Sequence, residues 1–119
     1  MLKTKLPKTY EENAYKHPEH GFNGIAWTRE TLEKFLEDPT VSKVVILGGD
    51  ILQKDHNDRL NYTYESWAVS ARSPTESYDS YCVRSREKAR EYLKIMRNSE
   101  GVLIAPVLTD EATAGLHAK

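Results

Sequence analysis

The sequence predicts a two-layer α+β domain: two amphipathic helices cover one face of a small, mostly antiparallel sheet of about three or four strands. Residues 28–38 and 75–97 repeat apolar side chains at the spacing of one helix face. Two β-branched, apolar runs, 43–47 and 102–105, have the composition of strands. The polar stretch 54–59 predicts a hairpin between the first strand and a returning one.

The two ends of the chain lack such periodicity. Residues 1–24 hold isolated aromatics among Lys, Glu, His, Pro and Gly, so we expect an extended arm or loop pinned by those aromatics. A short helix fits around residues 10–16. Residues 110–119 have little to bury and are expected to fray. Without a low-complexity linker, the whole chain, 1–119, is predicted to be one domain.

The first helix has clear start and stop signals. The Thr28 hydroxyl can cap the backbone amide of Glu30 or Thr31 at its beginning. Asp38 precedes a proline, which pushes it out of the helical region and ends the helix. The apolar face between them consists of Leu32, Phe35 and Leu36.

The first strand leads into two glycines. Val44 to Leu47 are apolar without alternation, as in a strand that is covered on both faces or lies in mid-sheet. Gly48-Gly49 predict a bulge, a bend or the close approach of another backbone. The returning strand spans residues 60–70. If Tyr64 and Trp67 both face the core, their odd spacing requires a bulge near Glu65-Ser66.

The second helix is the strongest local signal. Residues 73–76 offer capping oxygens, a first-turn proline and an acid, so we expect the helix to begin there. Small residues in the middle of its apolar stripe predict close packing on the sheet. Beyond it, Gly101 suits a left-handed conformation, and Pro106 is expected at the end of the last strand or on an edge. The stripe comprises Tyr78, Tyr81, Cys82, Ser85, Ala89, Tyr92, Leu93 and Met96.

Composition excludes several function classes. The 119 residues carry 17 Lys and Arg against 18 Asp and Glu. This balance excludes the bulk electrostatics of a nonspecific nucleic-acid binder or an acidic mimic of nucleic acid. A single cysteine excludes an internal disulfide and a zinc site with two or more thiolates. With no secretory signal and no apolar run of membrane-spanning length, we expect a cytoplasmic protein without a membrane partner.

No catalytic or cofactor site emerges from the motifs. Gly48-Gly49-Asp50 lacks the further glycine and the Lys-Ser/Thr of a phosphate loop, so a structural bulge is favoured, with Asp50 bonding nearby backbone. The alternative is that Asp50 is exposed at the sheet edge and meets a basic partner. Cys82 lies on an apolar stripe, where a free cysteine usually packs as a small hydrophobe. Ser85 lies on the same stripe, so we interpret the likeness of Ser85-x-x-Lys88 to a catalytic Ser-x-x-Lys motif as a coincidence.

Histidines with nearby acids are the only metal-site candidates. His17 and His20 flank a proline that argues against a helix aiming both rings together, and His56 lies in a turn-rich hairpin. We therefore expect no metal, no cofactor and no enzyme activity.

Three segments resemble a known family. Residues 45–51 (VILGGDI), 62–67 (YTYESW) and 83–92 (VRSREKAREY) are similar to immunity protein 40, one of the bacterial immunity families encoded beside polymorphic or contact-dependent toxins. The resemblance implies a protein that binds and neutralises one cognate toxin domain. The residues that carry the motif, expected to be structural, are Gly48, Gly49, Asp50, Tyr64, Trp67, Ser85 and Ala89.

The charge placement suggests two docking surfaces. If the cognate toxin is a nuclease, its basic groove would be steered and held by acidic side chains, here Glu30, Glu33, Glu37, Asp38, Asp55 and Asp58. The alternative is a regulatory module that contacts nucleic acid through the basic outer side of helix 75–97. A solvated face with pairs at helical spacing explains that basic side equally well. Its residues are Arg84, Arg86, Lys88, Arg90, Lys94 and Arg97.

Overall fold

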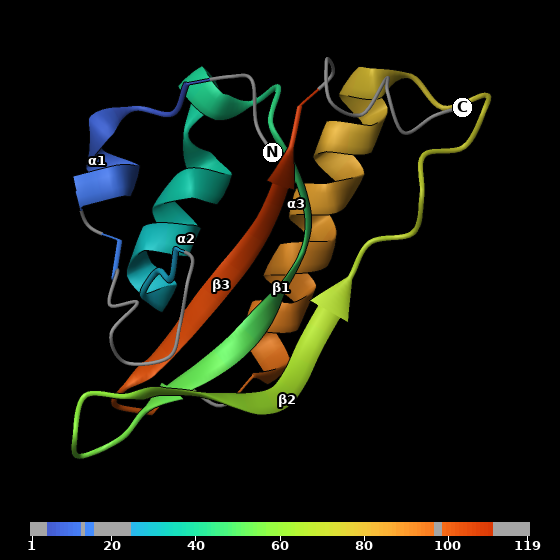
Figure 1. Ribbon diagram of the computed structural model, residues 1–119. Helices are drawn as coiled ribbons and strands as arrows, with labels where there is room; N and C mark the ends of the chain where they lie inside the picture. Colours follow the sequence, from blue (N-terminus) through green and yellow to red (C-terminus); the bar gives the residue numbers. More distant parts are fainter. Residues whose placement is uncertain (1–4, 13, 16–24, 97–98, 111–119) are drawn as a thin grey trace.

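The computed structural model describes residues 5–12, 14–15, 25–96 and 99–110 (Figure 1). Three strands form one antiparallel sheet in the order β2-β1-β3. This confirms the predicted α+β class. The elements are α1 (Lys8–Glu12), α2 (Arg29–Glu37), the 3-10 helix η2 (Pro39–Val41), β1 (Val45–Lys54), β2 (Leu60–Ala68), α3 (Tyr78–Ile95) and β3 (Val102–Thr109).

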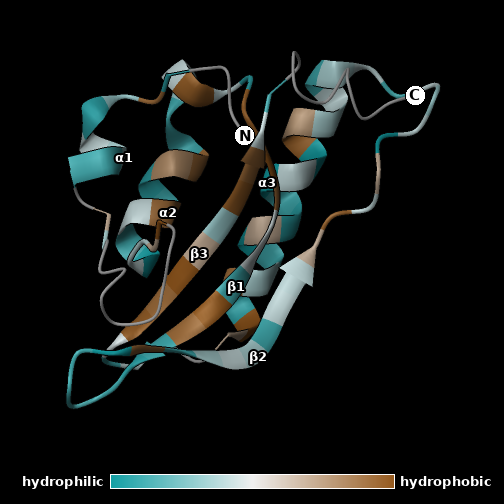
Figure 2. Cartoon of the chain, viewed as in Figure 1, coloured by the Kyte–Doolittle hydropathy of each residue, from teal (hydrophilic) through white to brown (hydrophobic). Residues whose placement is uncertain are grey.

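Helices α2 and α3 share one core with the sheet. Ile51 of β1 is paired with Ile104 of β3, so the two side chains lie on the same sheet face. Both belong to a buried cluster with Phe35 of α2 and with Ala89 and Leu93 of α3. In Figure 1, α3 runs along β1, whereas α1 and α2 lie beyond β3. Figure 2 shows the hydrophobic colour on β1 and β3, while β2, at the sheet edge, is mostly pale or hydrophilic.

Helix α2 begins and ends as its sequence predicts. The Thr28 hydroxyl accepts a hydrogen bond from the Thr31 amide at 3.2 Å, and Asp38 is extended at the other end. The predicted apolar face is buried. Just before the helix, Trp27 exchanges two backbone hydrogen bonds of 2.7 Å with Ile104. These bonds tie the start of α2 to the outer edge of β3.

The N-terminal segment contains a short helix, which the sequence allowed around residues 10–16, but it lies earlier in the chain. Residues 8–12 form the short helix α1, and its Tyr10 is buried. The Tyr10 hydroxyl donates to the Asp38 carboxylate at 2.6 Å, and the Trp27 indole N–H donates to the Tyr10 carbonyl at 3.0 Å. Residues 1–4, 13 and 16–24 of the expected arm and 111–119 of the expected tail lie outside the described residues. The first residue of the tail that we expected to fray over 110–119, Asp110, is buried, which corrects the prediction at that position.

Strand β1 contains the predicted glycine bulge. Ile46 is opposite Leu108 and Gly48 is opposite Val107, so Leu47 is an extra residue without a partner in β3. Pro106 does not end β3, which continues to Thr109; the other expectation, an edge position, is confirmed because Pro106 faces β1 on one side only. A proline is tolerated there because its missing N–H interrupts no ladder.

Helix α3 begins at Tyr78, later than we predicted. The Ser77 hydroxyl caps it by accepting from the Ser80 amide at 3.1 Å. Residues 73–76 instead form a turn in which the Ser73 amide donates to the Glu76 carboxylate at 3.2 Å. The predicted stripe is confirmed as the inner face of the helix, with Tyr92 only partly buried.

Candidate functional site

The four expected partner-binding acids at α2 differ in what they can offer. Glu30, Glu33 and Glu37 are exposed on the helix. Asp38 accepts from the Tyr10 hydroxyl at 2.6 Å and from the amide and hydroxyl of Thr40 at 2.9 and 2.7 Å. These hydrogen bonds, first the one from Tyr10, hold the pKa of Asp38 below its ordinary value. Asp38 therefore joins α1 to the end of α2.

The two acids at the β1–β2 hairpin differ in the same way. Asp55 accepts from the Arg59 amide, the Asn61 side chain and the Asn57 amide, which together lower its pKa. Asp55 thus builds the turn. The Asp58 carboxylate is 67% exposed and lies 3.8 Å from the Lys54 ammonium.

Acidic and basic side chains meet in a groove between α2 and α3. The Arg90 guanidinium donates to the Leu36 carbonyl at 2.9 Å and lies 3.7 Å from the Glu37 carboxylate. Arg29 lies 3.8 Å from Glu33 on the same rim. The charges of the two helices therefore partly balance here. The groove, about 400 Å³, is lined by Arg29, Glu33, Leu36, Glu37, Arg90, Leu93 and Lys94.

Six basic residues were expected on the outer side of α3. The structure corrects one of them, Arg86, and shows that other arginines of the set are bound to groups of this chain. Arg86 is buried, not outward, and donates to the Val44 carbonyl at 2.7 Å and, closer still, to the Val41 carbonyl. Its guanidinium also lies over the Phe35 ring. Position 86 is four residues after Cys82 and three before Ala89, so it borders the buried stripe, and the carbonyls of Val41 and Val44 satisfy the buried guanidinium. Arg97 lies outside the described residues.

Arg84 is bound to its own chain. Its guanidinium makes two hydrogen bonds to the Glu76 carboxylate, at 2.8 and 2.9 Å, and further ones to Ser70 and Ala71. The hydrogen bonds from Arg84 lower the pKa of Glu76 to about 2. A guanidinium that is fixed in this way is less available to phosphate groups than a free one.

The Gly48-Gly49 pair makes room for Trp67. A Cβ atom on Gly48 would lie 2.2 Å from the Trp67 carbonyl oxygen, and one on Gly49 would lie 2.6 Å from two carbons of its ring. The Trp67 ring in turn stacks on Tyr92 of α3, with 5.1 Å between ring centroids. Asp50, next in β1, is half-buried in the central strand rather than at the sheet edge, which corrects that alternative.

Ser85 and Ala89 hold α3 close to β1. The Ser85 hydroxyl donates to the Cys82 carbonyl at 2.9 Å and accepts from the Ile46 amide at 3.3 Å, beside the bulge. Ala89 is fully buried. A larger side chain at either position would push the helix from the sheet.

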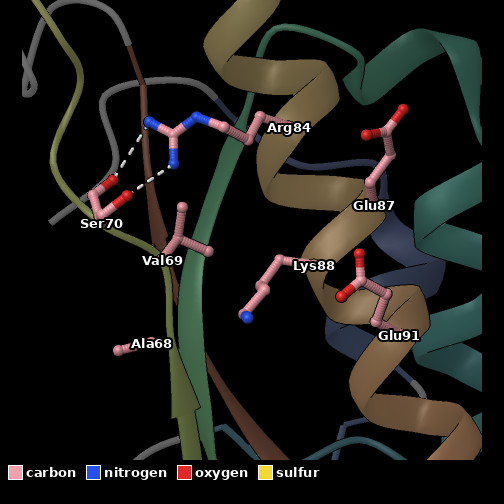
Figure 3. A pocket seen from close by; sticks show the side chains of 7 residues that line it. All are labelled: Ala68, Val69, Ser70, Arg84, Glu87, Lys88 and Glu91. Atoms are coloured by element: carbon pink, nitrogen blue, oxygen red, sulfur yellow. Dashed lines mark hydrogen bonds between the residues drawn. The ribbon is translucent and has the colours of Figure 1, made fainter.

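A second groove separates α3 from the end of β2. In Figure 3, Arg84 and Lys88 extend from α3 toward residues 68–70, and dashed lines join Arg84 to Ser70. Glu87 and Glu91 complete the α3 side. The groove measures about 330 Å³ and is open to solvent.

Strand β2 is irregular between Tyr62 and Ser66, which includes part of the region near Glu65-Ser66 where we predicted a bulge. Leu52 pairs with Tyr62 and Asp50 with Ser66, so residues 63–65 all stand opposite Ile51. Tyr64 does not face the core: its side chain is 96% exposed and its backbone is left-handed, with φ +68°. Such a conformation costs a non-glycine residue about 1 kcal/mol or more. The odd Tyr64–Trp67 spacing was the available signal.

The described residues show no activated nucleophile or metal cluster. Cys82 is buried, and burial raises the pKa of its thiol, which lowers the fraction of reactive thiolate. In the same part of the chain, no three His, Cys, Asp or Glu side chains are placed to hold a metal ion. His17 and His20 lie outside that part. None of the described helices is long and apolar enough to cross a membrane.

Together these features define a small α+β protein with two charged grooves, one on each side of α3. The family model of immunity protein 40 matches residues 18–108, and the chain therefore belongs to that family. Comparison with curated proteins and with solved structures gave no match. An immunity family implies a cognate toxin as the partner, and its members are in general not enzymes.

Proposed function

We propose that this protein binds the toxin domain of a polymorphic or contact-dependent toxin system in the bacterial cytoplasm and blocks it without catalysing any reaction. Membership of the immunity protein 40 family, over residues 18–108, is the observation that carries the proposal. The bound protein would cover the toxin's active site or an adjacent surface. An interface of ordinary size, about 1,600 Å² in total, is sufficient for such inhibition.

We also propose that the toxin presents a basic surface, as a nuclease does around its substrate groove. Glu30, Glu33, Glu37 and Asp58 are exposed, so they can face such a surface. Their neighbours Asp38 and Asp55 add negative charge while they hold the local backbone. Acidic side chains around an interface accelerate encounter with a basic partner and reject partners of the wrong charge.

Nucleic acid is the less favoured partner for two reasons. Arg86 is buried, and Arg84 and Arg90 donate to groups of their own chain. A nucleic-acid binder should give a gel shift that weakens steeply with salt. We expect the purified protein to give no shift with DNA or RNA.

Co-expression tests the proposal. The toxin domain encoded in the neighbouring reading frame is induced in a host that carries this protein or an empty vector. We expect growth only with this protein, and we expect no rescue from a toxin of an unrelated system. Death of the host despite soluble expression of this protein would refute the proposed function.

A further inference from the structure

Strand β2 forms the free edge of the sheet and presents two exposed tyrosines. Among the described strands it pairs with β1 only, in the order β2-β1-β3. Tyr62 is 53% exposed and Tyr64 is 96% exposed. With Asp58 at the hairpin tip and the exposed Glu65, they make up what we call the β2 edge surface. The remaining β2 side chains are smaller, polar or buried, so the two rings dominate this edge.

The backbone around Tyr64 is held in place from inside the strand. The Thr63 hydroxyl donates to the Ile51 carbonyl at 2.9 Å, across the gap that the irregular pairing leaves. The same hydroxyl accepts from the Glu65 amide at 3.1 Å. One side chain thus fixes the residues on both sides of Tyr64. The left-handed conformation is built into the strand and is not a loose loop tip.

The fold gains no burial from the Tyr64 side chain. A glycine or asparagine would adopt φ +68° more easily, and an almost fully exposed ring contributes nothing to the core. Strained, over-determined residues of this kind cluster at functional sites. Tyrosine is also enriched among the side chains that dominate protein–protein binding energy, and a backbone that is already held in place loses little entropy on binding.

We infer that Tyr64 is the anchor side chain by which this protein docks on its toxin, inserting into an apolar pocket on a basic surface of the toxin domain. This inference rests on the proposed function and adds an anchor at the β2 edge surface, which shares Asp58 with the proposed acidic set. Glu30, Glu33 and Glu37 on α2 lie beyond β3, across the sheet (Figure 1), and steer the encounter with the toxin. The charges around the β2 edge surface support a basic partner. Glu87 and Glu91 line the groove between β2 and α3, where the lining cations are Lys88 and Arg84, and Glu76 neutralises Arg84. Glu65 on β2 is also exposed, so the acids on this side outnumber the remaining cations, Lys88 and Arg72. A basic partner therefore fits this side better than an acidic one.

The test separates binding from folding by substituting glycine for the strained residue. The affinity of the purified chain for the toxin domain from the neighbouring reading frame is measured for wild type, Tyr64→Gly and Tyr64→Phe. We expect Tyr64→Gly to weaken binding about 30-fold or more, the effect of removing a hot-spot side chain. Its urea midpoint should equal or exceed that of wild type. Tyr64→Phe should bind nearly as well as wild type.

A second exposed apolar residue provides the matched control. Val107→Ala, on β3 and 49% exposed, should leave affinity unchanged. If Tyr64→Gly binds like wild type, the anchor is wrong although the proposed function stands. If Tyr64→Gly unfolds the protein, the tyrosine is structural and the inference is again wrong. If the wild-type chain does not bind the toxin domain, both the inference and the proposed function fail.

Discussion

The ring of Trp67 lies so close to Gly49 that a Cβ atom there would come within 2.6 Å of two ring carbons. The contact joins β1 to β2, and the stacking of Trp67 on Tyr92 extends it to α3. The most distinctive motif of the sequence thus serves packing across three elements. The glycine pair therefore belongs to the fold, and we propose that exposed residues elsewhere bind the partner.

Gly49→Ala should lower the free energy of unfolding by about 1–3 kcal/mol, because the added methyl group overpacks the Trp67 ring. Urea denaturation measures the loss. In a Trp67→Leu background the loss should shrink. Gly48→Ala is the control, because its clash is with the Trp67 backbone oxygen and should persist in that background. Equal losses from Gly49→Ala in both backgrounds would contradict the ring contact.

Arg86→Met should destabilise the fold by about 2–4 kcal/mol, because it removes the donor of two buried hydrogen bonds and leaves the carbonyls of Val41 and Val44 unsatisfied. Lys88→Met, at an exposed position two residues further along α3, should change stability by no more than about 0.5 kcal/mol. Chemical denaturation of both variants measures the difference. Similar stabilities would show that Arg86 is solvated rather than buried.

The Glu76–Arg84 pair predicts a loss of stability in acid. The pKa of Glu76 is lowered from 4.5 to about 2 in the folded protein, so its stabilising contribution is complete above about pH 4.5 and is lost as the pH falls toward 2. Glu76→Gln should therefore show a shallower decline in urea midpoint between pH 5 and pH 2.5 than wild type. If the urea midpoints of the two proteins fall equally with pH, the acid sensitivity arises from other carboxyl groups with lowered pKa, of which Asp38 and Asp55 are the first candidates.

Reversing acidic charges should slow association with the toxin domain. We expect the double variant Glu33→Lys with Asp58→Lys to lower the association rate about tenfold or more at low salt, and the difference should fade at high salt. The matched control is Glu12→Lys with Glu100→Lys, which changes the net charge equally at other exposed positions. Stopped-flow mixing gives the rates. If the two variants associate at the same rates, only the net charge of the protein matters, and the proposed acidic surface is wrong.

Local signals in the sequence predicted much of the fold. The Thr28 cap, the Asp38-Pro39 stop and the stripe of α3 rest on short-range hydrogen bonding and periodicity, and the structure agrees with them. One expectation was wrong because a nearby residue competes locally: Ser77 caps α3 in place of residues 73–76.

Other features depend on contacts between distant residues. Arg86 looked solvent-facing because charge usually marks the outer side of a helix, but its partners are the carbonyls of Val41 and Val44, more than 40 positions earlier in the chain. The sequence left open whether Tyr64 faces the core with Trp67, because an aromatic residue in a strand can lie on either face. Only the pairing with β1, with three residues opposite Ile51, reveals that it is exposed.

The most direct test of the central claim is a titration of the isolated toxin domain's activity with this purified protein. If the protein is an immunity protein that acts by binding, activity should fall linearly to zero at a fixed stoichiometric ratio, and the complex should co-elute on size exclusion. Full toxin activity at a large molar excess of the folded protein would contradict the claim.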